Sequence, residues 1–363
     1  MENGAAGPPG RVDELAVQDL LAAITRHRVT ETLEPHARQI GIPDDVVAAL
    51  GQRRRTDRSM LAVRHLELGR AGEVLSSGGI RWMQVKGSAL AVQTTGRTDG
   101  RGFGDIDLFI APDDVRDAVR LLTAAGWEQR GPRTLPDSWG WRYMLDTSYE
   151  LTFDSPGSTL DLHWRLGPTH HAMAGFEDAW SRRVGLDLDG LAVATLSVGD
   201  ALTHACHHAA KDEWRWMRSL VDVHRLARLP GAWPRELSLV ERNTFHVTGA
   251  CFGLPDEVPG PARATIQRTP LRVLRRAMIA QSRPLETELP PPGVETLRQV
   301  RRSLAESRAL PDVRRTLAAA IVPYPSVADL DDRTAWTAVP RMLGRRVRRV
   351  VDRWSAWRRI DGS

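Results

Sequence analysis

The amino-acid sequence predicts an α+β protein in which a small mixed β-sheet unit is embedded in a larger all-helical body. Two observations predict this class. Apolar residues recur at helical spacing from residue 12 to about 75 and again after 197, whereas between 80 and 165 they form short strand-like runs. A length of 363 residues also allows more than one domain. We expect a disordered leader at 1–11, N-terminal helices at 12–79, the α/β unit at 80–196 and a C-terminal helical domain at 197–363.

The N-terminal part begins with a segment rich in glycine and proline, which is why we expect residues 1–11 to be disordered. The helical spacing that follows ends at Gly78-Gly79, because consecutive glycines stop a helix.

The α/β unit is predicted from alternation and from turn residues. We expect about five strands among the strand-like segments Ile80–Val85, Asp105–Ile110, Trp127–Gln129, Tyr143–Leu145, Tyr149–Phe153 and Thr159–Trp164. A helix is expected to begin at Pro112, where proline and two acids occupy the first turn, and to end at Gly126.

The C-terminal part is predicted to be helical almost throughout. Asp200–Arg228 reads as one long helix or as a pair of helices. Further helices are expected at about 261–283, 294–308, 311–322 and 337–357. Proline residues separate them.

Charge and composition exclude several classes of protein. Eight arginines and two aspartates fall between residues 341 and 361, which accounts for the whole net charge of +5. The rest of the chain therefore lacks the broad basic surface that nucleic-acid binding requires, and we expect no sequence-specific nucleic-acid partner. No apolar run is long enough to span a bilayer, no signal peptide is recognisable, and two cysteines fit a reducing compartment. A cytoplasmic protein is expected.

The strongest chemical signal is the pair Asp105 and Asp107. On a strand, residues i and i+2 point to the same face, so both carboxylates project together while Ile106 and Leu108 face a core. Two neighbouring carboxylates repel each other unless a cation lies between them, and Mg²⁺ prefers oxygen ligands of this kind. A solvated polar strand face is the alternative interpretation.

Two further segments favour a metal site. Lys86-Gly87-Ser88 follows a strand and opens a helix, where backbone N–H groups can bind phosphate oxygens. On the later strand, Asp161 lies on the same face as His163, and a third carboxylate could complete a two-metal cluster.

The lysine content is unusual. Lys86 and Lys211 are the only lysines in the sequence, although lysine and arginine together number 50. A lysine retained in such a chain can mark a position that requires a compact ammonium group, which a planar guanidinium cannot replace. Chance survival is the alternative interpretation, above all for Lys211.

The order of these segments resembles the nucleotidyltransferase fold of the polymerase-beta type. The Lys-Gly after a strand, the Arg101-x-x-x-Asp105-Ile-Asp107 block, the Asp161-Leu-His163-Trp block and a His-rich helix resemble, within that superfamily, a family of uncharacterised nucleotidyltransferases. This family often occurs in bacterial natural-product and peptide-modification gene clusters. The interval from Gly87 to Asp105 is longer than the superfamily's commonest spacing.

The resemblance implies a metal-dependent enzyme that transfers a nucleoside monophosphate from a nucleoside triphosphate to an acceptor hydroxyl, with release of pyrophosphate. It implies that Asp105, Asp107 and Asp161 are catalytic and hold Mg²⁺ or Mn²⁺. It further implies that the triphosphate is bound by Lys86, Gly87, Ser88, Arg101 and Lys211, with His208 as a further candidate.

Two other functions remain open at this stage. A nucleotide-binding scaffold protein could keep the fold without catalysis. A metal hydrolase could use His163, His204 and His208, although the helix that carries the last two lacks the Glu of a His-Glu-x-x-His motif. The sequence does not specify the acceptor, the nucleotide base or the oligomeric state.

Overall fold

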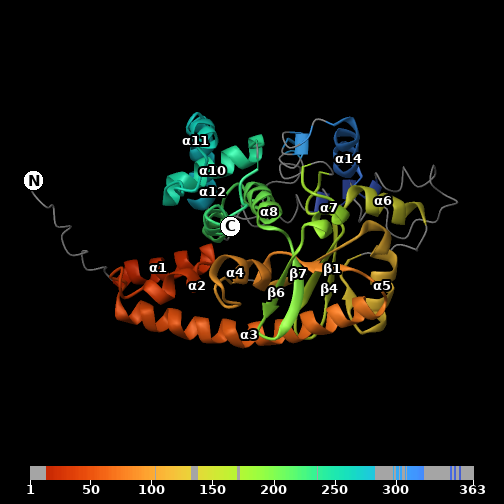
Figure 1. Cartoon of the computed structure of the whole chain (residues 1–363), viewed down its shortest axis with the longest axis horizontal. Helices are drawn as coiled ribbons and strands as arrows, with labels where there is room; N and C mark the ends of the chain where they lie inside the picture. Colours follow the sequence, from red (N-terminus) through yellow and green to blue (C-terminus); the bar gives the residue numbers. More distant parts are fainter. Residues whose placement is uncertain are drawn as a thin grey trace, which may run out of the picture.

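The computed structural model describes residues 14–102, 104–131, 138–169, 172–234, 236–282 and 309–322, and single positions between 297 and 307 and between 344 and 352. The predicted α+β class is confirmed: a small mixed sheet lies among helices that make up most of the fold (Figure 1). In this described part of the chain, no helix has the length and apolar character needed to cross a membrane.

The N-terminal segment leads into one long helix that runs beneath the sheet (Figure 1). Its elements are α1 (Glu14–His27), α2 (Thr30–Leu33), the short 3-10 helix η1 (Glu34–His36) and α3 (Asp44–Ser77). Two acids in the first turn of α3 complement the helix dipole, and Gly78 caps its C-terminal end. Gly79 follows with a φ of 75°, so the predicted glycine stop is confirmed.

Five strands form one mixed sheet with the order β1-β2-β5-β4-β3. The strands are β1 (Trp82–Gln84), β2 (Asp105–Ile110), β3 (Glu128–Gln129), β4 (Glu150–Asp154) and β5 (Thr159–His163). Strands β2 and β5 run parallel at the centre, and all other neighbours pair antiparallel. A parallel pair needs a long crossover, so β2 and β5 are far apart in the sequence. Their pairing nevertheless makes Asp107 and Asp161 direct neighbours.

The two faces of the central strands differ in polarity. Ile106 and Leu108 of β2 and Leu160 and Leu162 of β5 are buried in one hydrophobic core, together with side chains of α3 and of α5 (Val115–Ala124). The acidic residues of both strands alternate with these and therefore lie on the opposite face. Helix α5 follows the 3-10 turn η2 (Pro112–Asp114), as the proline and acids predicted.

Two elements differ from the sequence prediction. The segment Tyr143–Leu145 is not a strand, because it lies in helix α6 (Trp139–Thr147). The Ser138 hydroxyl accepts a hydrogen bond from the backbone N–H of Trp141 at 3.0 Å and caps that helix. A hairpin of β6 (Val184–Leu188) and β7 (Leu191–Thr195) was not predicted at all.

Within the described residues, the C-terminal part is helical, as predicted. Its helices are α8 (Val198–Lys211), α9 (Met217–Leu226), α10 (Leu239–Phe252), α11 (Gly260–Gln267), α12 (Arg272–Ser282) and α14 (Leu310–Ile321), after the short α7 (Phe176–Ser181). The stretch Asp200–Arg228 is thus a pair of helices, α8 and α9. The leader and most of the helices expected at 294–308 and 337–357 lie outside the described residues, and the domain boundaries stay predictions.

Candidate active site

The turn between β1 and helix α4 (Gly87–Thr95) has a strained backbone. Lys86 takes φ 59° and ψ −144°, a conformation that is nearly restricted to glycine, and Gly87 follows with φ 47°. A non-glycine residue in such a conformation costs about 1–3 kcal/mol, so its surroundings must impose it. The Val85 N–H donates to the Asp107 carbonyl at 3.0 Å, which ties the turn to strand β2.

This turn directs the Lys86 side chain at Asp107. The ammonium Nζ lies 2.7 Å from Asp107 Oδ1, and the Asp107 side chain is only 2% exposed. Burial lowers the pKa of Lys86, but the Asp107 carboxylate outweighs it and raises that pKa above its ordinary value. Lys86 is therefore a charged ammonium bound to the central acid of the sheet's polar face.

Asp107 and Asp161 occupy paired positions on the parallel strands β2 and β5. The Thr152 hydroxyl of β4 donates to Asp161 Oδ1 at 2.6 Å, and His163 Nε2 lies 3.0 Å from Asp107 Oδ1. Because a carboxylate can only accept, the His163 Nε2 carries the hydrogen of that bond. Asp107, Asp161 and His163 each offer one ligand atom, and these three atoms lie within 4.8 Å of one another. The three side chains therefore form a donor cluster that could hold a metal ion. We call these three residues the carboxylate cluster.

The two carboxylates of the carboxylate cluster have opposite pKa shifts. Burial alone raises the pKa of Asp107, but the Lys86 ammonium and the hydrogen bond from His163 hold it well below its usual range. Burial also raises the pKa of Asp161, and there the Thr152 hydroxyl is too weak a compensation. Asp107 is thus stably ionised, whereas Asp161 carries a negative charge that its surroundings disfavour.

Both lysines of the sequence lie at this polar face. Lys211, in the last turn of α8, donates from Nζ to the Tyr149 hydroxyl at 3.1 Å and lies 5.5 Å from the centre of the Tyr149 ring. Although burial opposes it, Tyr149 and Glu150 raise the pKa of Lys211. The Tyr149 ring in turn stacks against His163, with 6.4 Å between the ring centres. The two ammonium groups therefore flank the carboxylate cluster.

Asp105 lies beside the carboxylate cluster but is not one of its members. It lines a cavity of about 130 Å³ together with Asp107, Lys86 and His208. We call this the aspartate cavity. Arg28, Arg101 and Arg218 also line it, so carboxylates and cations share this cavity.

Two predicted phosphate-binding residues have partners within the protein. Arg101 Nε lies 2.9 Å from both carboxylate oxygens of Asp222 on α9, and both side chains are buried. The Ser88 side chain is fully buried and exchanges hydrogen bonds with the Gln84 side chain at 3.0 and 3.2 Å. These contacts hold the turn and the loop in position, while Gly87 presents the N-terminus of α4.

The histidines of α8 lie near the same site without forming a metal cluster. His204 is buried, and its ring centre is 6.3 Å from that of His208. Burial and the neighbouring Lys86 ammonium lower the pKa of both imidazoles. Among the described residues, the potential metal donors that group together include neither of these histidines.

Several site residues escaped the sequence analysis. Glu150 Oε2 lies 3.3 Å from His163 Nδ1, and Asp222 holds Arg101. Glu150 could have been found, because it alternates with buried Leu151 on β4 just as the predicted acids alternate with buried residues on β2 and β5. Asp222 and Arg218, by contrast, lie on a helix whose position beside the loop no local pattern indicates.

One comparison with known proteins identifies the chain's relatives. The sequence profile of a family described as uncharacterised nucleotidyltransferases matches residues 13–245. That match spans the whole sheet, helices α1 to α9 and every site residue described above. No curated protein matches the chain. With well over half of its length matched, the chain belongs to the family of uncharacterised nucleotidyltransferases.

Proposed function

We propose that this protein transfers a nucleoside monophosphate from a nucleoside triphosphate to an acceptor hydroxyl, and that Asp105, Asp107 and Asp161 are the catalytic carboxylates. The observation that carries the proposal is the pairing of Asp107 with Asp161 on parallel strands next to the strained turn at Lys86. Membership of the family supports nucleotidyl transfer in general.

The residues of the carboxylate cluster suit a divalent cation. Carboxylate oxygens are the ligands that Mg²⁺ and Mn²⁺ prefer. The negative charge of Asp161, which burial disfavours, would be relieved by a cation. When bound, such an ion would polarise the acceptor hydroxyl and the phosphate oxygens, either alone or as one of a pair.

In the proposed step, the acceptor hydroxyl oxygen forms a bond to the α-phosphorus. The bond from the α-phosphorus to the oxygen that bridges it to the β-phosphorus breaks, and pyrophosphate leaves with that electron pair. The hydroxyl proton passes to a carboxylate oxygen of the site.

The cations at the site would stabilise the charge that develops on the phosphates. Lys86 and Lys211 flank the carboxylate cluster as compact ammonium groups, and the backbone at Gly87 presents the α4 N-terminus to the β- and γ-phosphates. The partners of Ser88 and Arg101 favour positioning roles for them: Ser88 supports the turn through Gln84, and Arg101 holds the loop before Asp105 through Asp222.

The test is metal-dependent binding and turnover of nucleotide by the full chain. Wild-type protein is incubated with α-labelled ATP, GTP, CTP or UTP, Mg²⁺ or Mn²⁺ and a small-molecule cell extract, and labelled product and pyrophosphate are measured. We expect Asp161→Asn to lower turnover at least about 100-fold, as expected when a charge-stabilising group is lost. A wild-type protein that binds no nucleotide with either metal would contradict the proposal.

A matched control is available on the neighbouring strand. Asp154 of β4 is a carboxylate of the same sheet, but it pairs with Arg130 in solvent and lies outside the carboxylate cluster. Asp154→Asn should keep wild-type turnover. If Asp161→Asn also keeps wild-type turnover, the catalytic assignment is wrong. If the wild type and both variants bind nucleotide but none of them turns it over, the scaffold alternative is favoured.

A further inference from the structure

A second, larger cavity adjoins the aspartate cavity. Its volume is about 310 Å³, which is within the range of small-molecule sites. It lies between α2, α3, the loop that precedes Asp105 and α9, and we call it the arginine cavity. Arg28, Arg101 and Arg218 line both cavities, so the two adjoin at these three side chains.

Residues 96–102 and 104, in the loop before strand β2, form one wall of the arginine cavity. Three of its glycine carbonyls each accept a hydrogen bond from an arginine: Gly100 from Arg225 at 3.1 Å, Gly102 from Arg218 at 2.8 Å and Gly104 from Arg64 at 3.2 Å. Helices α3 and α9 thus hold this loop from two sides. The loop accounts for the long interval between Gly87 and Asp105. The wall is therefore a built part of the fold.

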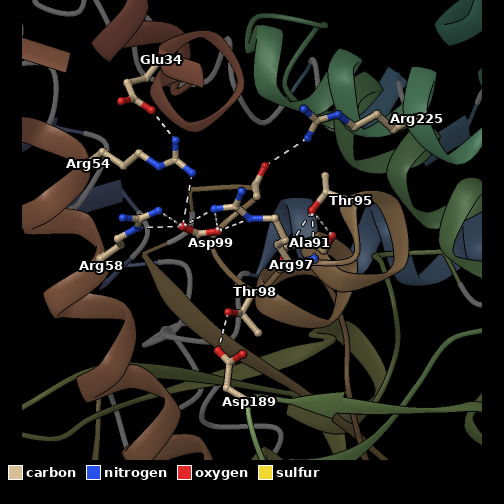
Figure 2. A network of polar contacts seen from close by, with 11 residues as sticks. Glu34, Arg54, Arg58, Ala91, Thr95, Arg97, Thr98, Asp99, Asp189 and Arg225 are labelled. Carbon is tan, nitrogen blue, oxygen red and sulfur yellow. Dashed lines mark hydrogen bonds and ion pairs between the residues drawn. The ribbon is translucent and has the colours of Figure 1, made fainter. Parts of the chain in front are cut away.

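Positive charge exceeds negative charge in the arginine cavity. Among the described residues that line it, seven are arginines and three are acids. One of those acids, Asp99, accepts hydrogen bonds from Arg54, Arg58 and Arg97 at 3.3, 2.7 and 2.9 Å (Figure 2). Arg54 also bonds to Glu34, so two carboxylates face these three guanidinium groups and do not neutralise them.

The guanidinium of Arg218, at the junction of the two cavities, is affected by the same excess of positive charge. Burial and the neighbouring Arg101 lower the pKa of Arg218 to about 10. Within the described structure its Nε is buried without a hydrogen-bond partner. An anion in the arginine cavity would supply the missing acceptor.

We propose that the arginine cavity binds the acceptor of the reaction through an anionic group, a phosphate or a carboxylate, and that the acceptor is therefore a small anionic molecule with a hydroxyl. This inference rests on the proposed function. Planar guanidinium groups bind both kinds of anion in a bidentate manner. The hydroxyl would reach Asp105 and Asp107 past Arg28, Arg101 and Arg218, which line both cavities.

The phosphates of the nucleotide are a different anion, and their site is expected elsewhere. They are assigned to the turn at Lys86 and Gly87, neither of which lines the arginine cavity. Conversely, Arg53 and Arg58 line the arginine cavity and not the aspartate cavity. Variants at these arginines can therefore separate acceptor binding from nucleotide binding.

The experiment compares two arginines of α3 that differ in position. Arg58 lines the arginine cavity, whereas Arg55 is also solvent-exposed, bonds to Gln52 and lies outside the cavity. Calorimetric titration of the full chain uses inorganic phosphate and, separately, citrate as probes. We expect Arg58→Gln to weaken binding of at least one probe about ten-fold, the loss of one charge-assisted hydrogen bond, and Arg55→Gln to leave it unchanged.

A second arm repeats the titration with Mn²⁺ and saturating α,β-methylene analogues of the four nucleoside triphosphates. The proposal predicts that the probe still binds and that Arg58→Gln leaves analogue binding unchanged. Displacement of the probe by an analogue, with Arg58→Gln weakening both, would assign the cavity to the nucleotide and overturn the proposal. So would the absence of probe binding to wild type, or equal weakening in both variants. The proposed function fails separately, through Asp161→Asn.

Discussion

Two acids, Asp107 in the carboxylate cluster and Asp99 in the arginine cavity, are each held by several hydrogen-bond donors. The Asp107 side chain is 2% exposed and bonds to Lys86 and His163, whereas the Asp99 side chain is 15% exposed and bonds to three arginines. Burial raises the pKa of both acids, but their ammonium, guanidinium and hydrogen-bonding partners outweigh it, so both pKa values are lowered. The two acids differ in their access to water, and this determines how much free energy of unfolding is lost when the interactions of each acid are broken.

The largest effect is expected at Asp107. Asp107→Asn leaves the Lys86 ammonium buried without its carboxylate, and we expect the free energy of unfolding to fall by about 3 kcal/mol. Urea denaturation followed by circular dichroism measures this loss. A variant as stable as wild type would show that the Lys86–Asp107 pair is not what holds the turn.

A double variant distinguishes the structural from the catalytic contribution of this pair. Asp107→Asn combined with Lys86→Met removes both charges, so most of the lost stability should return while turnover stays absent. Recovery of turnover would remove Asp107 from the catalytic assignment.

A smaller effect is expected at Asp99. Asp99→Asn weakens the hydrogen bonds from three arginines at once, but water reaches Arg58 and Arg97 and replaces the lost interactions. We expect a loss of about 1.5 kcal/mol, the value of a hydrogen bond to a charged group. Asp117→Asn, at an exposed pair with Arg120, is the control and should change stability far less. If Asp99→Asn costs as much as Asp107→Asn, burial does not explain the difference between the regions.

A third effect has the opposite sign and depends on pH. Because burial raises the pKa of Asp161, the folded state binds its proton more tightly than the unfolded state, and stability falls as pH rises through that raised pKa. Asp161→Asn removes this titration. Relative to wild type, the variant should become more stable as pH rises upward from about 4, the unfolded pKa of aspartate. Thermal melts of both proteins across pH 4 to 8 provide the test, and a constant difference would contradict it.

The smallest effect on stability is expected at Arg58. Its side chain is 52% exposed, and Arg54 and Arg97 still hold Asp99 when it is replaced. Arg58→Gln should change the free energy of unfolding by less than about 1 kcal/mol. Thermal melts at low and high salt check this. A larger loss would mean that Arg58 supports the loop instead of remaining available to a ligand.

The sequence alone predicted the α+β class, the strand at Asp105–Ile110, the glycine stop after α3 and the acids that share one strand face. These features follow from local chemistry, because alternation sets the two faces of a strand and glycine ends a helix. The retention of only two lysines also pointed to the site, since Lys86 bonds Asp107 and Lys211 lies against Tyr149. Local pattern failed at Tyr143–Leu145, where a short apolar run fits a strand and one helix face equally well.

Only the tertiary structure decided what lies beside what. Alternation places Asp107 and Asp161 on strand faces, but the parallel crossover brings the two strands together in register. The pair of Arg101 with Asp222, and the arginine cavity that adjoins it, join residues far apart in the chain. Such contacts form because a charge enters the interior only with a partner, and the packing of α3 and α9 around the loop, not the neighbouring sequence, determines which partner is within reach.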